Sequence, residues 1–437
     1  MLKLKSVFVP VVWVLSLVVS NVTVAQSIPI LSDPIKVREV ELMSNRLQMG
    51  AAQQEALLEV YDRYLLDFAR VRSGEIKEFE DGIGEAAETF GFMQFEIPER
   101  ELVEGLIRKA ERAIRAIHQS DTLFFEEVSG MLTENQRVTL KRIEIARELE
   151  AYEMIALEML GRLNEGARVN IRSLFKSLNA ESSVEIDEIL DIYDKRFLKE
   201  AKGGFDSVIV TMRMLLDQID DLNIRGLDQQ ALMMRFMADP EAIEDLKRRG
   251  EILLKPLVNQ VYEISQLNWN TWKRLHVLLS KEDAYRLQQW YFGKSFRDAV
   301  RGGTKVEDYF NVAVGLNSIS ESKKIDLQEL QKVFRSKWTS MSETHAEVIE
   351  SSRQNQTIAI MAGDAKSGFE ERLDALQQKR TEYVDKTISR IESILGKELV
   401  AQLEGDSKKK NSRVSNGSAE SSGGSVTVSS DGNASEV

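Results

Sequence analysis

The stretch "TLKRIEIARELEAYEMIALEMLGRL" (residues 139–163) decides the fold class of this chain. Its apolar residues recur three or four positions apart, with charged residues between them, which is the pattern of an amphipathic helix. The stretch "IRKAERAIRAIH" (residues 107–118) has the same spacing. No part of the sequence shows the sustained alternation of Val, Ile and Thr between turn residues that predicts strands. We therefore predict an all-α protein.

Several segments of the chain resemble one another, which indicates internal repeats. The first group aligns on an aromatic residue (Tyr61, Tyr193 or Phe334) and comprises "LLEVYDRYLL" (57–66), "ILDIYDKRFL" (189–198) and "LQKVFRSKW" (330–338). The second group shares a leucine at both ends and comprises "LTENQRVTL" (132–140), "LSKEDAYRL" (279–287) and "LGKELVAQL" (395–403). We interpret the two groups as the two halves of one unit. The chain would then hold three diverged repeats of long antiparallel helical hairpins in an elongated arrangement.

The repeats and the composition of the two ends predict the domain organisation. We expect a signal peptide at 1–25, a leader segment at 26–46, helical units at 47–165, 166–315 and 316–405, and a tail at 406–437. The tail is rich in Ser, Gly and Asn and has almost no large apolar residue. It cannot bury enough surface to offset the entropy of ordering, so we predict that it is disordered.

The first 25 residues have the pattern of a secretory signal peptide. Lys3 and Lys5 precede an apolar run at 7–19, and the small residue Ala25 marks the expected cleavage point. The run is shorter than the about 20 apolar residues of a membrane-spanning helix. An uncleaved anchor stays open as the alternative. We predict export to the periplasm or cell envelope, or secretion, without integral membrane insertion after cleavage.

Charge and cysteine content narrow the class of protein. The chain has 70 acidic and 58 basic residues, a formal net charge of −12. Sequence-independent binding of nucleic acid depends on Lys and Arg meeting phosphates, so no nucleic-acid partner is predicted. The chain contains no Cys, which excludes disulfides and lipidation of an N-terminal cysteine.

The stretch "LTENQ" predicts the point where one helix ends and the next begins. Thr133 is a good N-cap, and Gln136 three residues later completes a capping box. We expect the Thr133 hydroxyl to accept from a backbone N–H and the Gln136 side chain to reach back to the cap. The leucine before each cap can pack across the corner between the helices. We assign this helix-start role to Leu132, Thr133, Gln136, Leu279, Ser280, Asp283 and Leu395.

This motif resembles one in a known family. The exported ATP-independent envelope-stress chaperones of the Spy and CpxP type carry Leu-Thr-x-x-Gln twice per unit. Residues 132–136 match the pattern fully, Leu279 and Ser280 match it in part, and Leu395 is the match in the third copy. The first motif of each unit would lie near Leu47, Leu178 and Ile319. The resemblance implies curved helical hairpins that form dimers and hold unfolded clients on a concave face. It also implies metal binding in some relatives.

The stretch 268–296 holds the densest group of aromatic residues, around the second predicted helix start. One interpretation is a well-filled junction between two antiparallel helices. The other is an apolar surface for a client or partner, because Trp and Tyr anchors dominate many interfaces. Exposure of at least two neighbouring rings would favour the second interpretation. The candidate residues are Trp269, Trp272, Tyr285, Trp290 and Tyr291.

A search for catalytic and metal-binding patterns yields no candidate. The three histidines, His118, His276 and His345, lack the Glu-x-x-His spacing of a di-iron bundle and have no second His at helical spacing. We therefore predict no catalytic residue, no cofactor and no metal ligand. Carboxylates brought together from several helices stay open as a metal site. An enzyme, our third reading, would need such carboxylates gathered in one pocket.

These observations lead to two functional hypotheses. The first is an exported, non-catalytic binding protein, a chaperone-like holdase or stress-responsive adaptor that binds an unfolded client or a protein partner. The alternative is a structural scaffold or coiled-coil spacer that binds one specific protein. Exposed apolar patches favour the first, and long heptads with a self-complementary seam favour the second. Self-association stays open in both.

Overall fold

The protein is described here by a computed structural model that covers residues 31–89, 99–154, 156–157, 160–225, 231, 234, 240–315, 319–362, 369–396 and 399. The regular structure within these ranges is helical, without a strand, which confirms the predicted all-α class. The predicted signal peptide (1–25) and tail (406–437) lie outside the described residues. None of the helices in the described ranges has the length and apolar content needed to cross a bilayer.

The chain divides into two compact units. The first unit contains the described residues up to Ala299 together with Thr344–Leu373, and the second contains Val300–Glu343 and the described residues from Asp374 onward. Helix α14 (Glu321–Ala362) is shared, because its first part belongs to the second unit and its later part to the first. The division into three repeats at 47–165, 166–315 and 316–405 stays a prediction.

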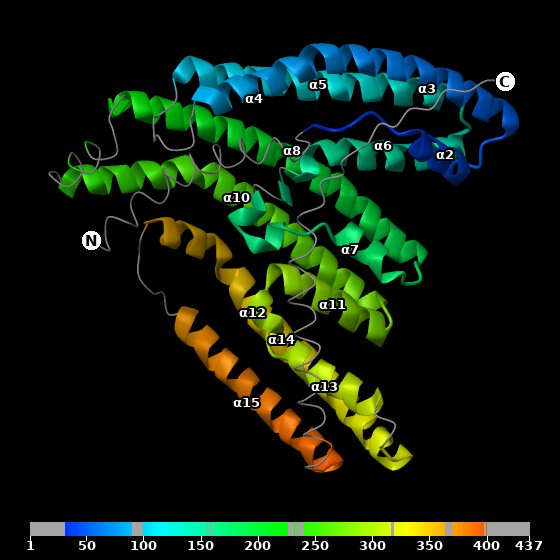
Figure 1. Ribbon diagram of the computed structural model, residues 1–437, viewed down its shortest axis with the longest axis vertical. Coiled ribbons are helices and arrows are strands. Elements are labelled where there is room, and N and C mark those ends of the chain that lie inside the picture. Colours follow the sequence, from blue (N-terminus) through cyan, green and yellow to red (C-terminus); the bar gives the residue numbers. More distant parts are fainter. Residues whose placement is uncertain are drawn as a thin grey trace, which may run out of the picture. The chain divides into compact units, whose positions relative to one another are not determined.

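The first unit begins with a long helical hairpin (Figure 1). The elements in this part of the chain are α2 (Val37–Arg46), α3 (Ala51–Val71), a π-helical turn (Arg72–Ile76), α4 (Lys77–Thr89), α5 (Arg100–Gly130) and α6 (Glu134–Met154). Helices α3 and α4 form one run that lies antiparallel against α5. Rings of Tyr64, Phe68 and Phe124 pack between α3 and α5, with centroids 5.0 Å apart for Tyr64 and Phe124.

Two tyrosines of α3 hold the preceding segment in place. The Tyr61 hydroxyl donates to the carbonyl of Ile35 at 2.8 Å, and the Tyr64 hydroxyl accepts from the Ile35 N–H at 3.1 Å. Tyr64 in turn donates to Asp121, whose carboxylate also accepts from Arg147 at 2.7 Å. Tyr61, on which the predicted repeats are aligned, therefore binds backbone rather than only filling the core.

The rest of the first unit is a second long helical pair, α8 and α10, with short helices around it (Figure 1). The elements are 3₁₀ turns at Leu160–Arg162 and Glu165–Ala167, α7 (Ile171–Leu178), α8 (Val184–Asp221), α10 (Pro240–Leu278), α11 (Lys281–Ser295) and, at the boundary, α12 (Arg297–Val300). Helix α6 packs on α8 and so joins the two pairs.

The second unit has its own core. It is built from α13 (Gly303–Gly315), the first part of α14 and, from Asp374 onward, α15 (Phe369–Leu395). The Phe334 ring stacks on Trp338 at 5.7 Å between centroids and on Tyr383 at 5.8 Å. Aliphatic side chains from all three helices complete this core, namely Val306, Leu327, Val384, Ile391 and Leu395.

Candidate functional site

The predicted helix start at 132–136 is a hydrogen-bonded junction. Helix α5 ends at Gly130 and α6 begins at Glu134. The Thr133 N–H donates to Oε1 of Gln136 at 3.0 Å, so the glutamine reaches back to the cap as predicted. The Thr133 hydroxyl differs from the prediction, because it donates to the same glutamine oxygen at 3.0 Å. The side chain of Gln136 thus organises the cap, and Leu132 is buried beside it.

A second glutamine, which the sequence analysis missed, mirrors this arrangement at the start of α3. The Gly50 N–H donates to Oε1 of Gln53 at 3.1 Å. The amides of Gln53 and Gln136 donate to each other's oxygens at 3.2 and 3.3 Å. Gln136 Nε2 also donates to the carbonyl of Leu47 at 2.8 Å, and Gln53 Nε2 to that of Met131 at 2.9 Å. Each glutamine therefore fixes its own helix start and the loop before the other helix.

The sequence held a signal for this pairing. Met49, Gly50 and Gln53 have the same spacing as Leu132, Thr133 and Gln136. The expected first motif began at Leu47, two residues too early, because Gly50 does not look like the threonine of the pattern. Gly is nevertheless an acceptable N-cap residue.

The other predicted helix starts take different forms. Ser280 accepts from the Asp283 N–H at 3.2 Å and donates to its carboxylate at 2.8 Å, as the capping pattern predicts, beside a half-buried Leu279. Leu395 is buried, but it is the last residue of α15. Gly396 follows with φ of +87° and donates to the Glu392 carbonyl at 2.8 Å, so it ends α15 in the left-handed conformation that favours glycine. The predicted helix start after it stays a prediction.

The aromatic region between α10 and α11 is a filled junction. Trp269, Trp272 and Tyr291 are buried, and they pack with Phe292 and Phe296 at centroid distances between 4.8 and 5.9 Å. These three rings therefore do not form an accessible partner surface. Of the other two candidates, Tyr285 is half-buried, and Trp290 is 37% exposed beneath the Arg286 guanidinium.

A buried polar cluster lies beside this junction, at the later part of α14. The Glu350 carboxylate accepts from the Ser265 hydroxyl at 2.8 Å and from Gln266 at 2.8 Å. The Arg353 guanidinium lies 3.3 Å from Glu350 and donates to Asn164 at 2.6 Å. Burial raises the pKa of Glu350, and Arg353 only partly offsets this rise. Both side chains are more than nine-tenths buried, so the cluster favours one packing of α14 rather than contact with a ligand.

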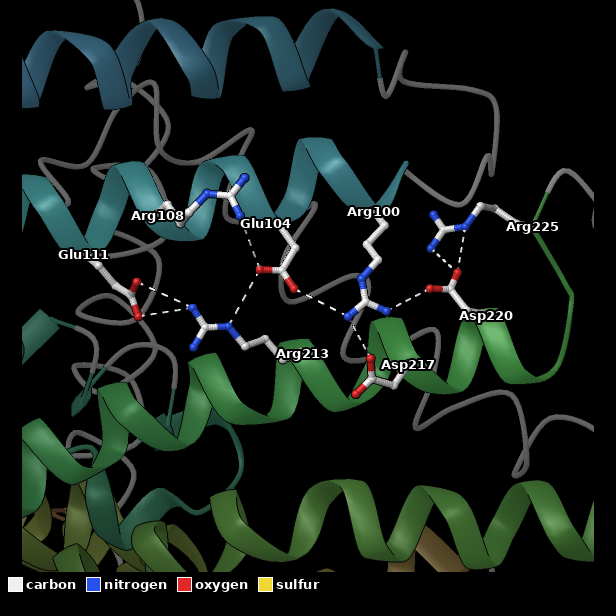
Figure 2. A network of polar contacts seen from close by, with 8 residues as sticks. All are labelled: Arg100, Glu104, Arg108, Glu111, Arg213, Asp217, Asp220 and Arg225. Atoms are coloured by element: carbon white, nitrogen blue, oxygen red, sulfur yellow. Dashed lines mark hydrogen bonds and ion pairs between the residues drawn. The ribbon is translucent and has the colours of Figure 1, made fainter.

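An accessible charged network joins α5 to α8 (Figure 2). Arg100 on α5 lies 2.8 Å from Asp217 and 2.9 Å from Asp220 of α8. Arg213 of α8 lies 3.8 Å from Glu104 and 3.4 Å from Glu111 of α5. Hydrogen bonds from Arg225 and Arg100 lower the pKa of Asp220 below its ordinary value.

Apolar side chains pack beneath these ion pairs. Val103 and Ile107 of α5 are buried against Ile209 and Leu216 of α8. Phe205 and Met212 are half-buried at the edge of this cluster. We call the ion pairs and this apolar cluster together the α5–α8 seam. Sequence periodicity showed that Ile107 faces a core, but it gave no signal for the helix that covers it.

A basic hollow of about 490 Å³ lies along α5 and is lined by Gly105, Arg108, Lys109, Glu111, Arg112 and Arg115. Arg112 lies 3.1 Å from Glu78, Lys109 lies 3.8 Å from Glu85, and Arg108 lies 3.9 Å from Glu104. These acids neutralise much of the local charge, so the hollow is a weaker candidate for ligand binding than the seam.

The histidines are dispersed in the structure. His118 lies 3.4 Å from Glu148, His276 packs against Trp272, and His345 is buried. Within the described ranges, no three His, Asp or Glu side chains come together in a way that could hold a metal ion. No protein-family model, curated protein or solved structure matches this chain. The interpretation of the site therefore depends on its own geometry.

Proposed function

We propose that this chain is an exported, non-catalytic binding protein that holds unfolded segments of client proteins without nucleotide, as the resemblance to the Spy and CpxP type implies. One observation carries the proposal. Three long helices each expose two aliphatic side chains eight residues apart, and the six residues are between 48% and 77% exposed. They are Leu58 and Leu66 on α3, Val184 and Ile192 on α8, and Ile325 and Val333 on α14.

The repetition of this spacing distinguishes these residues from ordinary surface residues. Single exposed apolar side chains are normal in soluble proteins. Here the same pair recurs on the first long helix of each predicted repeat. In α8 and α14 the two positions also agree in register. The first member of each pair lies nine residues before the aligned aromatic residue and the second lies one residue before it, the aromatic residue being Tyr193 in α8 and Phe334 in α14. Such agreement is what a repeated contact point would produce.

The geometry of the pairs suits an extended polypeptide. Eight residues of α-helix correspond to a rise of about 12 Å. An extended chain rises about 3.3 Å per residue, so client side chains four positions apart would lie about 13 Å apart. A single apolar stretch could therefore contact both members of a pair. The net charge of −12 would help to keep such complexes soluble.

The test is suppression of aggregation. The chain from residue 26 onward is mixed, without ATP, with a reduced or heat-unfolded model client, and light scattering is followed. We expect suppression near stoichiometric amounts. Substitution of the six paired aliphatics by Gln should reduce suppression several-fold.

A matched control removes the same number of exposed aliphatics outside the pairs. Substitution of Val37, Leu42, Leu123, Val138, Val210 and Val277 by Gln should leave suppression near the wild-type level. Equal losses in both variants would show that general hydrophobicity, and not the pairs, carries binding. No suppression by the wild type at several-fold excess would overturn the proposal. A spacer that binds one specific partner would then be sought by pull-down.

A further inference from the structure

The three exposed aliphatic pairs share a second feature, an acidic residue at the midpoint of each pair. The acid stands four residues after the first aliphatic residue and four residues before the second. The three acids, all of them exposed, are Asp62 on α3, Glu188 on α8 and Glu329 on α14. Residues four positions apart follow one ridge of a helix surface. Each helix therefore presents an apolar, an acidic and an apolar side chain in a row.

On α3 the neighbouring charges leave the midpoint acid available. Asp62 forms no ion pair with any of the described residues. Arg63, the next residue along the chain, is already paired with Glu127 of α5 at 2.5 Å. Glu59 is also exposed and adds a second negative charge between the two leucines. The α3 site is therefore acidic between its two apolar contacts.

The α8 site is the most acidic of the three. Every charged residue between its two aliphatic residues is an acid. Arg142 and Arg172 come from other helices, and both pair with Asp191, at 2.6 and 2.9 Å. Glu188 itself has no ion pair within the part of the chain that the structure describes. A cation is therefore attracted most strongly at this site.

The α14 site is the weakest. Lys332 pairs with Glu329 at 2.6 Å, and the two side chains are 72% and 63% exposed. Ion pairs with this exposure contribute little to stability, so a basic residue of a bound segment can take the place of Lys332. Asp326 is exposed nearby and keeps the site acidic.

An extended polypeptide matches the spacing of each row. In a strand, alternate side chains point to the same face, and two residues rise about 6.6 Å. On a helix, the Cβ atoms of residues four positions apart are about 5–6 Å apart. When two apolar residues of a segment contact the two aliphatic side chains, the residue midway between them therefore faces the acid.

We infer that each pair with its midpoint acid is a three-point contact site for an extended segment in which a basic residue stands midway between two apolar residues four positions apart. This inference rests on the proposed function and names the clients that it favours. A Lys or Arg at the midpoint is attracted by the acid, whereas an Asp or Glu there is repelled. The site therefore distinguishes charge at one position of the segment, and not only the net charge of the segment.

The experiment compares three labelled peptides by fluorescence polarisation with the chain from residue 26 onward. The peptides have the same Gly and Ser flanks, and their central stretches are Leu-Ser-Lys-Ser-Leu, Leu-Ser-Glu-Ser-Leu and Leu-Lys-Ser-Ser-Leu. The third has the composition of the first, but its Lys points to the opposite face of an extended chain. We expect the first peptide to bind several-fold more tightly than either of the others. Added salt should reduce the difference, because it screens exposed charges over about 10 Å at 0.1 M ionic strength.

Variants at the three acids locate the preference. Asp62→Asn, Glu188→Gln and Glu329→Gln, combined in one chain, keep the size of each side chain and remove its charge. The Lys-centred and Glu-centred peptides should then bind about equally. Asp62→Lys, Glu188→Lys and Glu329→Lys together should reverse the preference in favour of the Glu-centred peptide. Circular dichroism checks the fold of both variants.

A matched control removes three exposed acids outside the pairs, which have no ion pair with the described residues. The substitutions are Glu80→Gln, Glu101→Gln and Glu263→Gln. They change the net charge by the same amount as the neutral variant and should keep the wild-type preference.

No difference between the Lys-centred and Glu-centred peptides on the wild type, with client aggregation still suppressed, overturns this inference and leaves the proposed function standing. Equal binding of the two Lys peptides, or an equal loss of preference in the control variant, also overturns it, because net charge would then account for the preference. Failure of the wild type to suppress aggregation overturns the proposed function itself.

Discussion

At the scale of single residues, two glutamines carry the junction that the sequence motif marks. Each Gln side chain accepts from the backbone N–H of its own helix start and donates to a carbonyl of the opposite loop. A carboxylate at either position has no N–H to donate. The amide is thus required because it can do both at once.

Gln136→Ala should destabilise the first unit by about 2 kcal/mol, because it removes a cap contact of about 1 kcal/mol and hydrogen bonds of a similar total. Denaturant unfolding checks the value. Asn135→Ala, at the exposed neighbouring position, should change the free energy of unfolding by no more than about 0.5 kcal/mol. Gln53→Ala should be non-additive with Gln136→Ala, and strict additivity would contradict the reciprocal pairing.

The buried Glu350 gives a pH dependence with a definite sign. Its pKa in the folded protein is raised above the ordinary value of 4.5, so the folded state binds the proton more tightly than the unfolded state. The resulting stability is fully present below pH 4.5 and is lost as the pH rises through the raised pKa. Glu350→Gln mimics the protonated form and removes this dependence.

We therefore expect the free energy of unfolding of the wild type to fall relative to that of Glu350→Gln as the pH rises from 4 to 8. The fall should be about 1.4 kcal/mol for each unit by which the pKa of Glu350 in the folded state exceeds its pKa in the unfolded state. Urea unfolding of both proteins across this range measures the difference. A gain by the wild type instead would mean that attraction to Arg353 outweighs desolvation.

At the scale of helices, the packing of α13 against α14 depends on glycine, which has no side chain, at position 303. A Cβ on Gly303 would lie 2.2 Å from Nε1 of Trp338, whereas a Cβ on Gly315, at the other end of α13, would meet nothing within 4 Å. Trp338 is fully buried and stacked on Phe334, so it has no room to move.

Gly303→Ala should lower the stability of the second unit by about 1–3 kcal/mol, the usual cost of overpacking. Gly315→Ala should be neutral or stabilise the helix by up to about 1 kcal/mol. Thermal unfolding followed by tryptophan fluorescence compares the two. Similar effects of both substitutions would show that Trp338 does not set the spacing of these helices.

The sequence predicted the structural features that depend on residues close together in the chain. The helical class, the break before Thr133 and the caps at Thr133 and Ser280 follow from residues a few positions apart. The pairing of Gln53 with Gln136, the Ser265–Glu350 contact and the Arg100–Asp217 ion pair join residues more than 80 positions apart. Helical periodicity shows that a residue faces a partner but not which helix supplies it. The aromatic cluster illustrates this limit, because its composition suits a junction and a binding surface equally well.

At the scale of the whole molecule, α14 passes from one compact unit into the other without a break, and the division falls between Glu343 and Thr344. A helix of this kind has two populations of backbone amides. Those around Phe334 and Trp338 exchange hydrogen only when the second unit opens, and those around Glu350 and Arg353 only when the first unit opens. Deuterium uptake along α14 should therefore change rate near residue 343, and one uniform rate along the helix would mean that the two units open as one.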